Sequence, residues 1–235
     1  MPAQDRESPD AKTKALANLF DDWRKHWERR GLPVRRFVED GPVFPEDYWA
    51  LPARKRILFV LKETNEWFKR SDRSPEGRSI VRKTRAAIER GENEGWARLR
   101  TWAAMLSHQE YSQQIEKKRE VWAHVAILNL KKEDGGPTCL ELPLNWYALA
   151  DKTLILEEIE ILEPTILVLG GVTLPALWIL DMPFDDVNNP VLANGVSRRW
   201  WRGAKHRVYI CMPHPSYPRD NGVNRLRDVI KEAGL

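Results

Sequence analysis

Four short runs of consecutive apolar residues interrupt an otherwise polar chain, and each run ends abruptly in polar residues or glycines. Runs of this length without alternation are typical of strands that are buried on both faces, as in a parallel sheet. We therefore predict four buried strands. They lie within residues 56–65, 121–132, 165–171 and 208–212.

Segments with helical periodicity separate these runs. Leu16, Phe20, Trp23 and Trp27 recur at helical spacing against a charged face, which predicts an amphipathic helix over residues 11–30. Strands that alternate with helices favour a three-layer α/β/α fold with a four-stranded parallel sheet and right-handed crossovers. The other predicted helices cover residues 74–91, 93–108, 145–162, 175–180 and 223–233.

The same pattern divides the chain into three parts. Residues 1–10 have the composition of a disordered tail, residues 11–55 form a helical extension with a proline-rich connection, and residues 56–235 form the α/β domain. A chain of 235 residues can bury one substantial core. We therefore expect one α/β domain with an amino-terminal amphipathic helix.

Composition narrows the class of protein. No apolar run reaches the length of about 18 residues that a membrane helix needs, and the first ten residues are polar, so we expect a cytoplasmic, nucleoid-associated protein without membrane contact. Two cysteines are too few for a disulfide framework, a four-cysteine zinc site or an iron–sulfur cluster, and we predict no metal or cofactor. The formal charge of +4 is compatible with an anionic partner.

The polar ends of the predicted strands fall on one edge of the sheet, where open α/β folds bind their ligands. The last strand leads into residues 206–220, in which Pro213, Pro215 and Pro218 flank His214. Proline restricts its own φ and the residue before it, so this loop holds His214 rigidly. The alternative interpretation is a proline-rich surface turn with a solvated histidine.

The four strand ends carry the motifs LKETN (61–65), ILNLKK (127–132), TILVLGG (165–171) and PHPSYP (213–218). In order and spacing, these motifs resemble those of the uracil-DNA glycosylase superfamily. The resemblance covers roughly residues 55–233 and implies a four-stranded parallel sheet between helices. It also implies a cofactor-independent enzyme that hydrolyses the N-glycosidic bond of a base flipped out of DNA.

The first motif departs from the family pattern. Glu63 stands where relatives carry the Asp or Asn that positions the attacking water, and Asn65 replaces the Tyr that excludes bases substituted at the pyrimidine five-position. A longer carboxylate can still act as a general base. The missing gate leaves room for a thymine-like base, a deaminated purine or a bulky modified base.

The resemblance assigns the chemistry to two side chains. Glu63 would activate water and stabilise the positively charged sugar, while His214 would donate a hydrogen bond to the departing base. Asn129 carries a donor and an acceptor, which fits reading of the base's Watson–Crick edge. No lysine is placed as an evident Schiff-base nucleophile, although Lys62 lies in the first motif, so a monofunctional glycosylase is implied.

Further residues are assigned to the base and to DNA. Trp67 or Phe68 would stack on the flipped base, beside Asn65. The loop after His214 would enter the minor groove, and basic residues would hold phosphates in register. The residues assigned to DNA are Ser216, Tyr217, Pro218, Arg219, Lys131, Lys132, Arg198 and Arg199, with Arg202 and Lys205 near the last two.

Each assignment has a structural alternative. Glu63 can be a surface carboxylate paired with Lys62 or Arg70, and Asn129 can close a turn. Trp67 and Phe68 can be core residues. The loop after His214 can pack on the final helix, and the basic and aromatic segment near residue 200 can be a solvated ribbon.

Three functional hypotheses follow. The first is a monomeric DNA glycosylase acting on duplex or single-stranded DNA, in base-excision repair or in antiviral defence against phage DNA with modified bases. The second is an inactive protein of the same fold that binds DNA or a modified nucleotide. The third is an unrelated doubly wound enzyme that binds a phosphorylated small molecule at Gly170 and Gly171.

Overall fold

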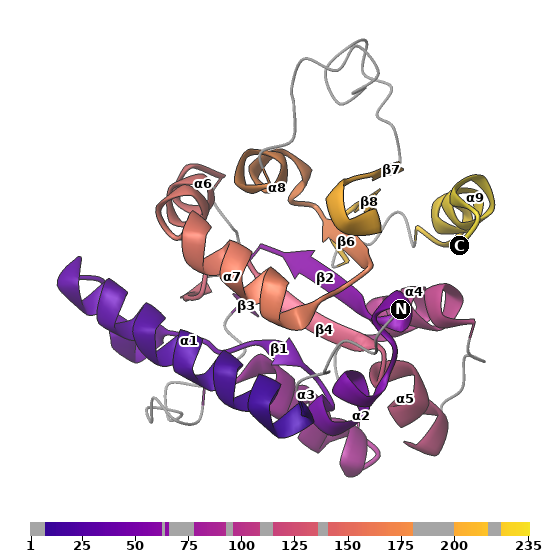
Figure 1. The fold of residues 1–235 in the computed structure, drawn as a ribbon, viewed down its shortest axis with the longest axis horizontal. Coiled ribbons are helices and arrows are strands. Elements are labelled where there is room, and N and C mark those ends of the chain that lie inside the picture. Colours follow the sequence, from indigo (N-terminus) through magenta and orange to yellow (C-terminus); the bar gives the residue numbers. More distant parts are fainter. Residues whose placement is uncertain are drawn as a thin grey trace, which may run out of the picture.

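The computed structural model of the protein describes most of the chain, and for residues 64 and 65 it describes only the backbone. The fold is mixed α/β, as predicted, with helices on both faces of a mostly parallel sheet (Figure 1). The described residues are 8–62, 64–65, 78–92, 96–108, 115–135, 141–180, 200–215 and 222–235.

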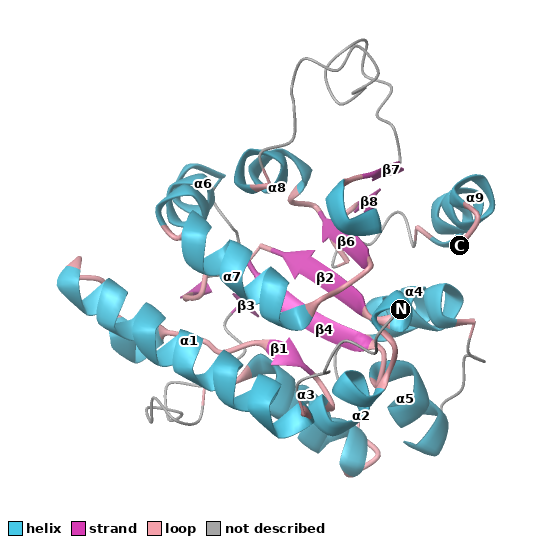
Figure 2. Cartoon of the chain, viewed as in Figure 1, coloured by secondary structure: helices cyan, strands magenta, loops and turns pink. Residues whose placement is uncertain are grey.

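The main sheet has six strands in the order β1-β4-β2-β6-β8-β7, rather than the expected four (Figure 2). The four central strands coincide with the four apolar runs and are mutually parallel, whereas the two short edge strands are antiparallel to their neighbours. The central strands are β2 (Ile57–Leu61), β4 (Val125–Asn129), β6 (Ile166–Gly170) and β8 (Val208–Met212). The edge strands are β1 (Gly41–Pro42) and β7 (Trp200–Arg202).

A second, two-stranded sheet lies directly after the ends of β2 and β4. Its strands β3 (Thr64–Asn65) and β5 (Asp134–Gly135) pair in parallel, with Asn65 opposite Gly135. The two chain segments that leave β2 and β4 therefore stay side by side beyond the main sheet.

Side chains that alternate along each central strand build two separate cores. Leu58 and Val60 of β2 face one core, and Ile57, Phe59 and Leu61 face the other. The first core is covered by α1 (Pro9–Arg29), α2 (Pro45–Ala50), α6 (Glu141–Ala150), α7 (Lys152–Leu162) and α8 (Thr173–Ile179). The second is covered by α3 (Ile80–Glu89), α4 (Ala97–Ser107), α5 (Ile115–Trp122) and α9 (Val223–Ala233).

Several helix boundaries differ from the sequence prediction. The helix predicted over 145–162 is two helices, α6 and α7, which meet at Asp151. The first two residues of the apolar segment 121–132 complete α5 instead of starting a strand. Short 3₁₀ turns occupy Val34–Arg36, Ala53–Lys55 and Ala204–His206.

Asp151 explains both the break between α6 and α7 and the position of α1. Its fully buried carboxylate accepts hydrogen bonds from the indole nitrogens of Trp23, at 2.9 Å, and Trp27, at 2.8 Å. Arg30 adds a third donor at 2.8 Å. Because both tryptophans are buried in the first core, α1 is integrated into the fold.

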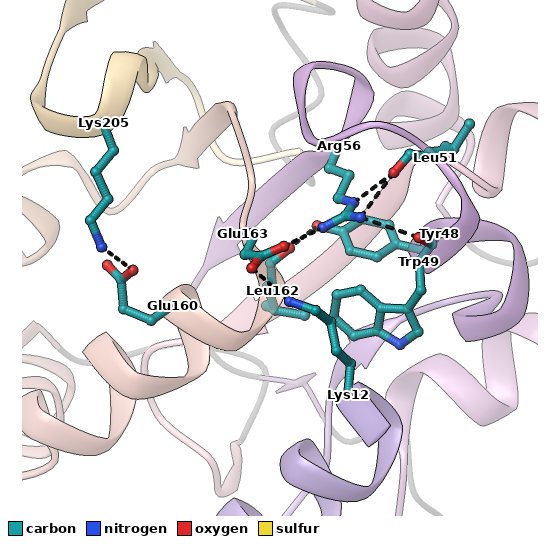
Figure 3. Close-up of polar contacts among 9 residues, drawn as sticks. All are labelled: Lys12, Tyr48, Trp49, Leu51, Arg56, Glu160, Leu162, Glu163 and Lys205. Atoms are coloured by element: carbon teal, nitrogen blue, oxygen red, sulfur yellow. Dashed lines mark hydrogen bonds and ion pairs between the residues drawn. The ribbon is translucent and has the colours of Figure 1, made fainter. Parts of the chain in front are cut away.

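On the amino-terminal side of the strands, Arg56 joins α2 and α7 (Figure 3). Its guanidinium donates to the carbonyl oxygens of Trp49 and Leu51 and to the carboxylate of Glu163, which also pairs with Lys12 of α1.

None of the helices in the described part of the chain has the length and apolar character needed to cross a membrane.

We predict that Asp151→Ala destabilises the protein by about 3 kcal/mol or more, because two buried indole N–H groups and a guanidinium lose their acceptor. Urea unfolding measures this loss. The control is Asp22→Ala on the exposed face of α1, which pairs only with Lys25 in a surface ion pair and should change stability by about 0.5 kcal/mol or less. Equal effects of the two substitutions would contradict the role of Asp151.

Candidate functional site

The strand order creates a topological switch point between β2 and β6. The chain leaves β2 toward the face covered by α3, α4 and α5, and it leaves β6 toward α8 on the opposite face. In open α/β sheets, ligands bind outside the carboxyl ends of the strands at such a point. The carboxyl ends of β2, β6 and β8 are therefore the candidate site.

Two glycines let these three strand ends approach closely. A Cβ atom on Gly171, which has φ +70°, would lie 2.8 Å from Cβ of His214. A Cβ atom on Gly170 would lie 2.8 Å from Leu61 Cδ2 and 3.4 Å from Pro215 Cδ. The Gly170-Gly171 pair is thus required by backbone packing against the His214 loop, which accounts for it without a phosphate ligand.

His214 lies at the carboxyl end of β8, half-buried, as the sequence predicted for the proline-braced loop. Burial, together with the smaller effects of the positive charges of Lys62 and Arg98, lowers the pKa of its imidazole to about 4. The imidazole is therefore neutral at physiological pH. A neutral imidazole can donate one hydrogen bond without carrying a charge.

Arg98 is a site residue that the sequence analysis missed. It comes from α4, and its guanidinium donates to the carbonyl oxygen of Pro215, next to His214. Lys62 follows β2 directly, and its own carbonyl oxygen accepts from the backbone nitrogen of Lys131 at 3.0 Å. Two cations from distant parts of the sequence therefore lie near one histidine.

The side chains of most of the other residues expected near His214 are not described by the structure. Asn65 is described only as a backbone position in β3. The following expected residues lie outside the described part of the chain: Glu63, Trp67, Phe68, Ser216, Tyr217, Pro218, Arg219, Arg198 and Arg199.

Lys132 is not available for a phosphate contact, so that expectation is wrong. Its side chain is fully buried, and its ammonium pairs with Asp40 at 2.5 Å and with Glu158 of α7 at 2.7 Å. A lysine can be buried this deeply only when its charge is matched. Lys132, three residues after the end of β4, is thus a structural ion-pair residue.

Asn129, at the end of β4, belongs to the same buried network. Its backbone nitrogen and its side-chain amide both donate to Asp40 Oδ2, the latter at 3.2 Å. Its Oδ1 atom is buried and has no hydrogen-bond partner among the described residues. One N–H of the amide expected to read a base is therefore bound to Asp40, while the Oδ1 acceptor has no partner among the described residues.

The buried network contains two carboxyl groups and one ammonium. Burial and the neighbouring charge of Asp40 raise the pKa of Glu158 well above its ordinary value. Burial alone would lower the pKa of Lys132, but Asp40 and Glu158 outweigh it and raise that pKa. The surroundings of Glu158 therefore favour its protonated form more than water does.

Three basic residues of the described chain are also paired within the protein, namely Lys131, Arg202 and Lys205. The Lys131 ammonium lies 3.5 Å from Glu133 and 5.4 Å from the Tyr147 ring centre. Lys205 pairs with Glu160, at the end of the strands opposite to His214 (Figure 3). Arg202 donates to the carbonyl oxygen of Ala233 at 2.6 Å.

The sequence contains a signal for one of the missed residues. Glu158 shares the apolar stripe of α7 with Ile155, Ile159 and Leu162, and a carboxylate at such a position predicts a buried cationic partner. Asp40 and Arg98 carry no comparable signal, because each lies in a segment whose polar residues are ordinary surface positions by pattern.

No protein-family model matches the chain, and no curated protein matches it significantly.

We predict that Glu158→Gln preserves the fold and flattens the pH dependence of stability. Because the folded-state pKa of Glu158 lies above its ordinary value, the folded protein loses stability as the pH rises above about 4.5. Glutamine has no proton to release, so melting temperatures measured between about pH 5 and pH 8 should fall less in this variant. Glu157→Gln, one residue away on the exposed side of α7, should keep the wild-type slope.

We predict that the His214 imidazole stays neutral between about pH 5 and pH 8, as followed by NMR of its ring protons. Lys62→Met should raise its pKa, because one repelling charge is removed, but burial should keep it below 6.5. Lys14→Met, on the exposed face of α1, is the control and should leave the titration unchanged. A wild-type midpoint near 6.5 would show that the imidazole is solvated.

Proposed function

We propose that the protein is a monofunctional DNA glycosylase of the uracil-DNA glycosylase superfamily, which removes a deaminated or modified base. The observation that best supports this proposal is the neutral imidazole of His214 at the meeting point of β2, β6 and β8, with two cations near it. This arrangement suits a reaction in which negative charge develops on a leaving group.

Hydrolysis of an N-glycosidic bond has a defined charge balance. As the bond between the sugar C1′ atom and the base nitrogen breaks, both bonding electrons leave with the base. Water bonds to C1′ and transfers a proton to Glu63, and the released base anion takes a proton from solvent. The enzyme must therefore stabilise a positive sugar and a negative base at once.

His214 serves the departing base in this proposal. A neutral imidazole N–H donates to a base oxygen without first losing a proton, and one preorganised donor of this type contributes on the order of 10²–10³-fold. Because burial keeps the pKa near 4, this donor is present across the physiological range. Glu63 follows Lys62 at the end of β2 and would activate water for roughly 10²–10⁴-fold.

Base recognition in the proposal is narrower than the sequence implied. Asp40 accepts from one N–H of the Asn129 amide, which leaves the second N–H and the Oδ1 atom as the groups proposed to read a base. Trp67, Phe68 and Asn65 would then supply stacking and space for a substituted base. The absence of a Tyr at position 65 suits a bulky modified base, and with it a role in phage defence as well as in repair.

The alternative is a protein of the same fold that binds DNA or a modified nucleotide without turnover. The occupied amide of Asn129 favours this alternative, because a base-reading residue is then bound to the protein itself. We propose DNA as the partner of the glycosylase, and DNA or a modified nucleotide as the partner of the alternative. In both cases we propose a cytoplasmic, nucleoid-associated monomer that needs no cofactor.

The decisive experiment is incubation with duplexes that carry uracil, hypoxanthine or a bulky modified cytosine, followed by alkali to cut abasic sites. We predict cleavage of at least one duplex, and a single-turnover rate lowered about 100-fold or more by His214→Ala or Glu63→Ala. The DNA dissociation constant of both variants should stay close to that of the wild type. Glu157→Gln is the matched surface control for Glu63→Ala.

The outcomes separate the proposals. DNA binding without abasic sites on any duplex contradicts the glycosylase and supports the inactive binding protein. Failure to bind duplex or single-stranded DNA at low salt contradicts both the glycosylase and a DNA-binding alternative, because phosphate contacts dominate affinity under that condition.

A further inference from the structure

The two charged side chains that the described part of the chain places near His214 are both positive. Lys62 arrives from the end of β2 and Arg98 from α4, and both act on the imidazole as positive charges. Placing two cations near a half-buried histidine is unfavourable for that histidine in its protonated form. The same field is favourable for a negative charge at the same place.

Hydrogen bonds fix the guanidinium of Arg98 and the main chain of Lys62. The Arg98 guanidinium is anchored to the Pro215 carbonyl oxygen, and Pro215 itself packs near Gly170 of β6. Lys62 is held at its α-carbon by the extension of the β2–β4 pairing to Lys131. Charges that are already oriented before the reaction need no reorganisation when negative charge develops.

We infer that Lys62 and Arg98 form, with His214, a two-cation subsite that stabilises the negative charge of the departing base. This inference rests on the proposed function and extends it, because neither cation belongs to the motif residues assigned to catalysis from the sequence. His214 contacts the base oxygen, and the two cations lower the energy of the anion around it.

The subsite has a consequence for the substrate class. Thymine and electron-rich modified pyrimidines are weak acids, and their anions are poor leaving groups. An electropositive site should therefore raise the rate of their removal most. Acidic bases such as 5-fluorouracil leave readily and gain least. The cations should therefore widen the range of bases that can be removed.

The test compares single-turnover rates of the wild type, Lys62→Met and Arg98→Met on duplexes carrying thymine, uracil or 5-fluorouracil. We expect each variant to lose about 10-fold on uracil, more on thymine and less on 5-fluorouracil, as Coulomb stabilisation of a developing anion requires. Arg98→Lys should recover part of the rate. Lys14→Met, which removes an exposed cation of α1, should match the wild type.

Two results would overturn the inference. One is an equal loss on all three bases. The other is weaker DNA binding with a salt slope reduced by about one, which marks a phosphate contact. Circular dichroism verifies that each variant is folded, and Lys62→Gln replaces Lys62→Met if the latter is not.

A second measurement does not depend on turnover. Free 5-nitrouracil is an anion at neutral pH, whereas free thymine is neutral. NMR of the His214 ring in the intact protein should show saturable binding of 5-nitrouracil with much weaker binding of thymine, and the Lys62→Met/Arg98→Met double variant should lose it. Selective binding of 5-nitrouracil without cleavage of any duplex would refute the glycosylase but support the subsite. Cleavage of a duplex without selective binding of 5-nitrouracil would refute the subsite alone.

Discussion

A single buried ammonium, that of Lys132, connects three parts of the chain that are far apart in sequence. It pairs with Asp40 before β1 and with Glu158 in α7, and Asp40 in turn binds Asn129 at the end of β4. Removing one partner from such a buried group typically costs about 3–5 kcal/mol, because the remaining charge has no match. The packing of the connection before β1 and of α7 against β4 depends on this contact.

This ion-pair network also determines where a ligand can bind. At the end of β4, Asn129 and Lys132 form hydrogen bonds with Asp40 and Glu158 inside the protein. Beyond β2, β6 and β8, Lys62 and Arg98 lie near the neutral His214, which packs against the Gly170-Gly171 turn. Among the described residues, one carboxyl edge of the sheet is thus divided into a structural part with internally paired charges and an electropositive part, and the second has the character of a site for an anion.

The four central strands could be predicted because a continuous apolar run requires burial on both faces whatever its neighbours are. The edge strand β1 has two residues, which is too short for any period to show, whereas β7 falls where the sequence indicated a short edge ribbon around Arg198–Arg202. The break between α6 and α7 escaped prediction for another reason: the apolar pattern continues through Asp151, and only the two indoles of α1 explain why a carboxylate is buried there.

The sequence by itself determined the α/β class, the positions of the parallel strands and the presentation of His214 by a proline-braced loop, since each follows from local pattern and backbone restriction. Only the tertiary structure decided which charges are buried and paired. Lys131 and Lys132 are neighbours of identical charge, yet Lys132 is enclosed by two carboxyl groups of distant segments while Lys131 lies beside Glu133. Desolvation and pairing depend on residues that are remote in sequence, and for the same reason the convergence of Lys62 and Arg98 on His214 could not be read from it.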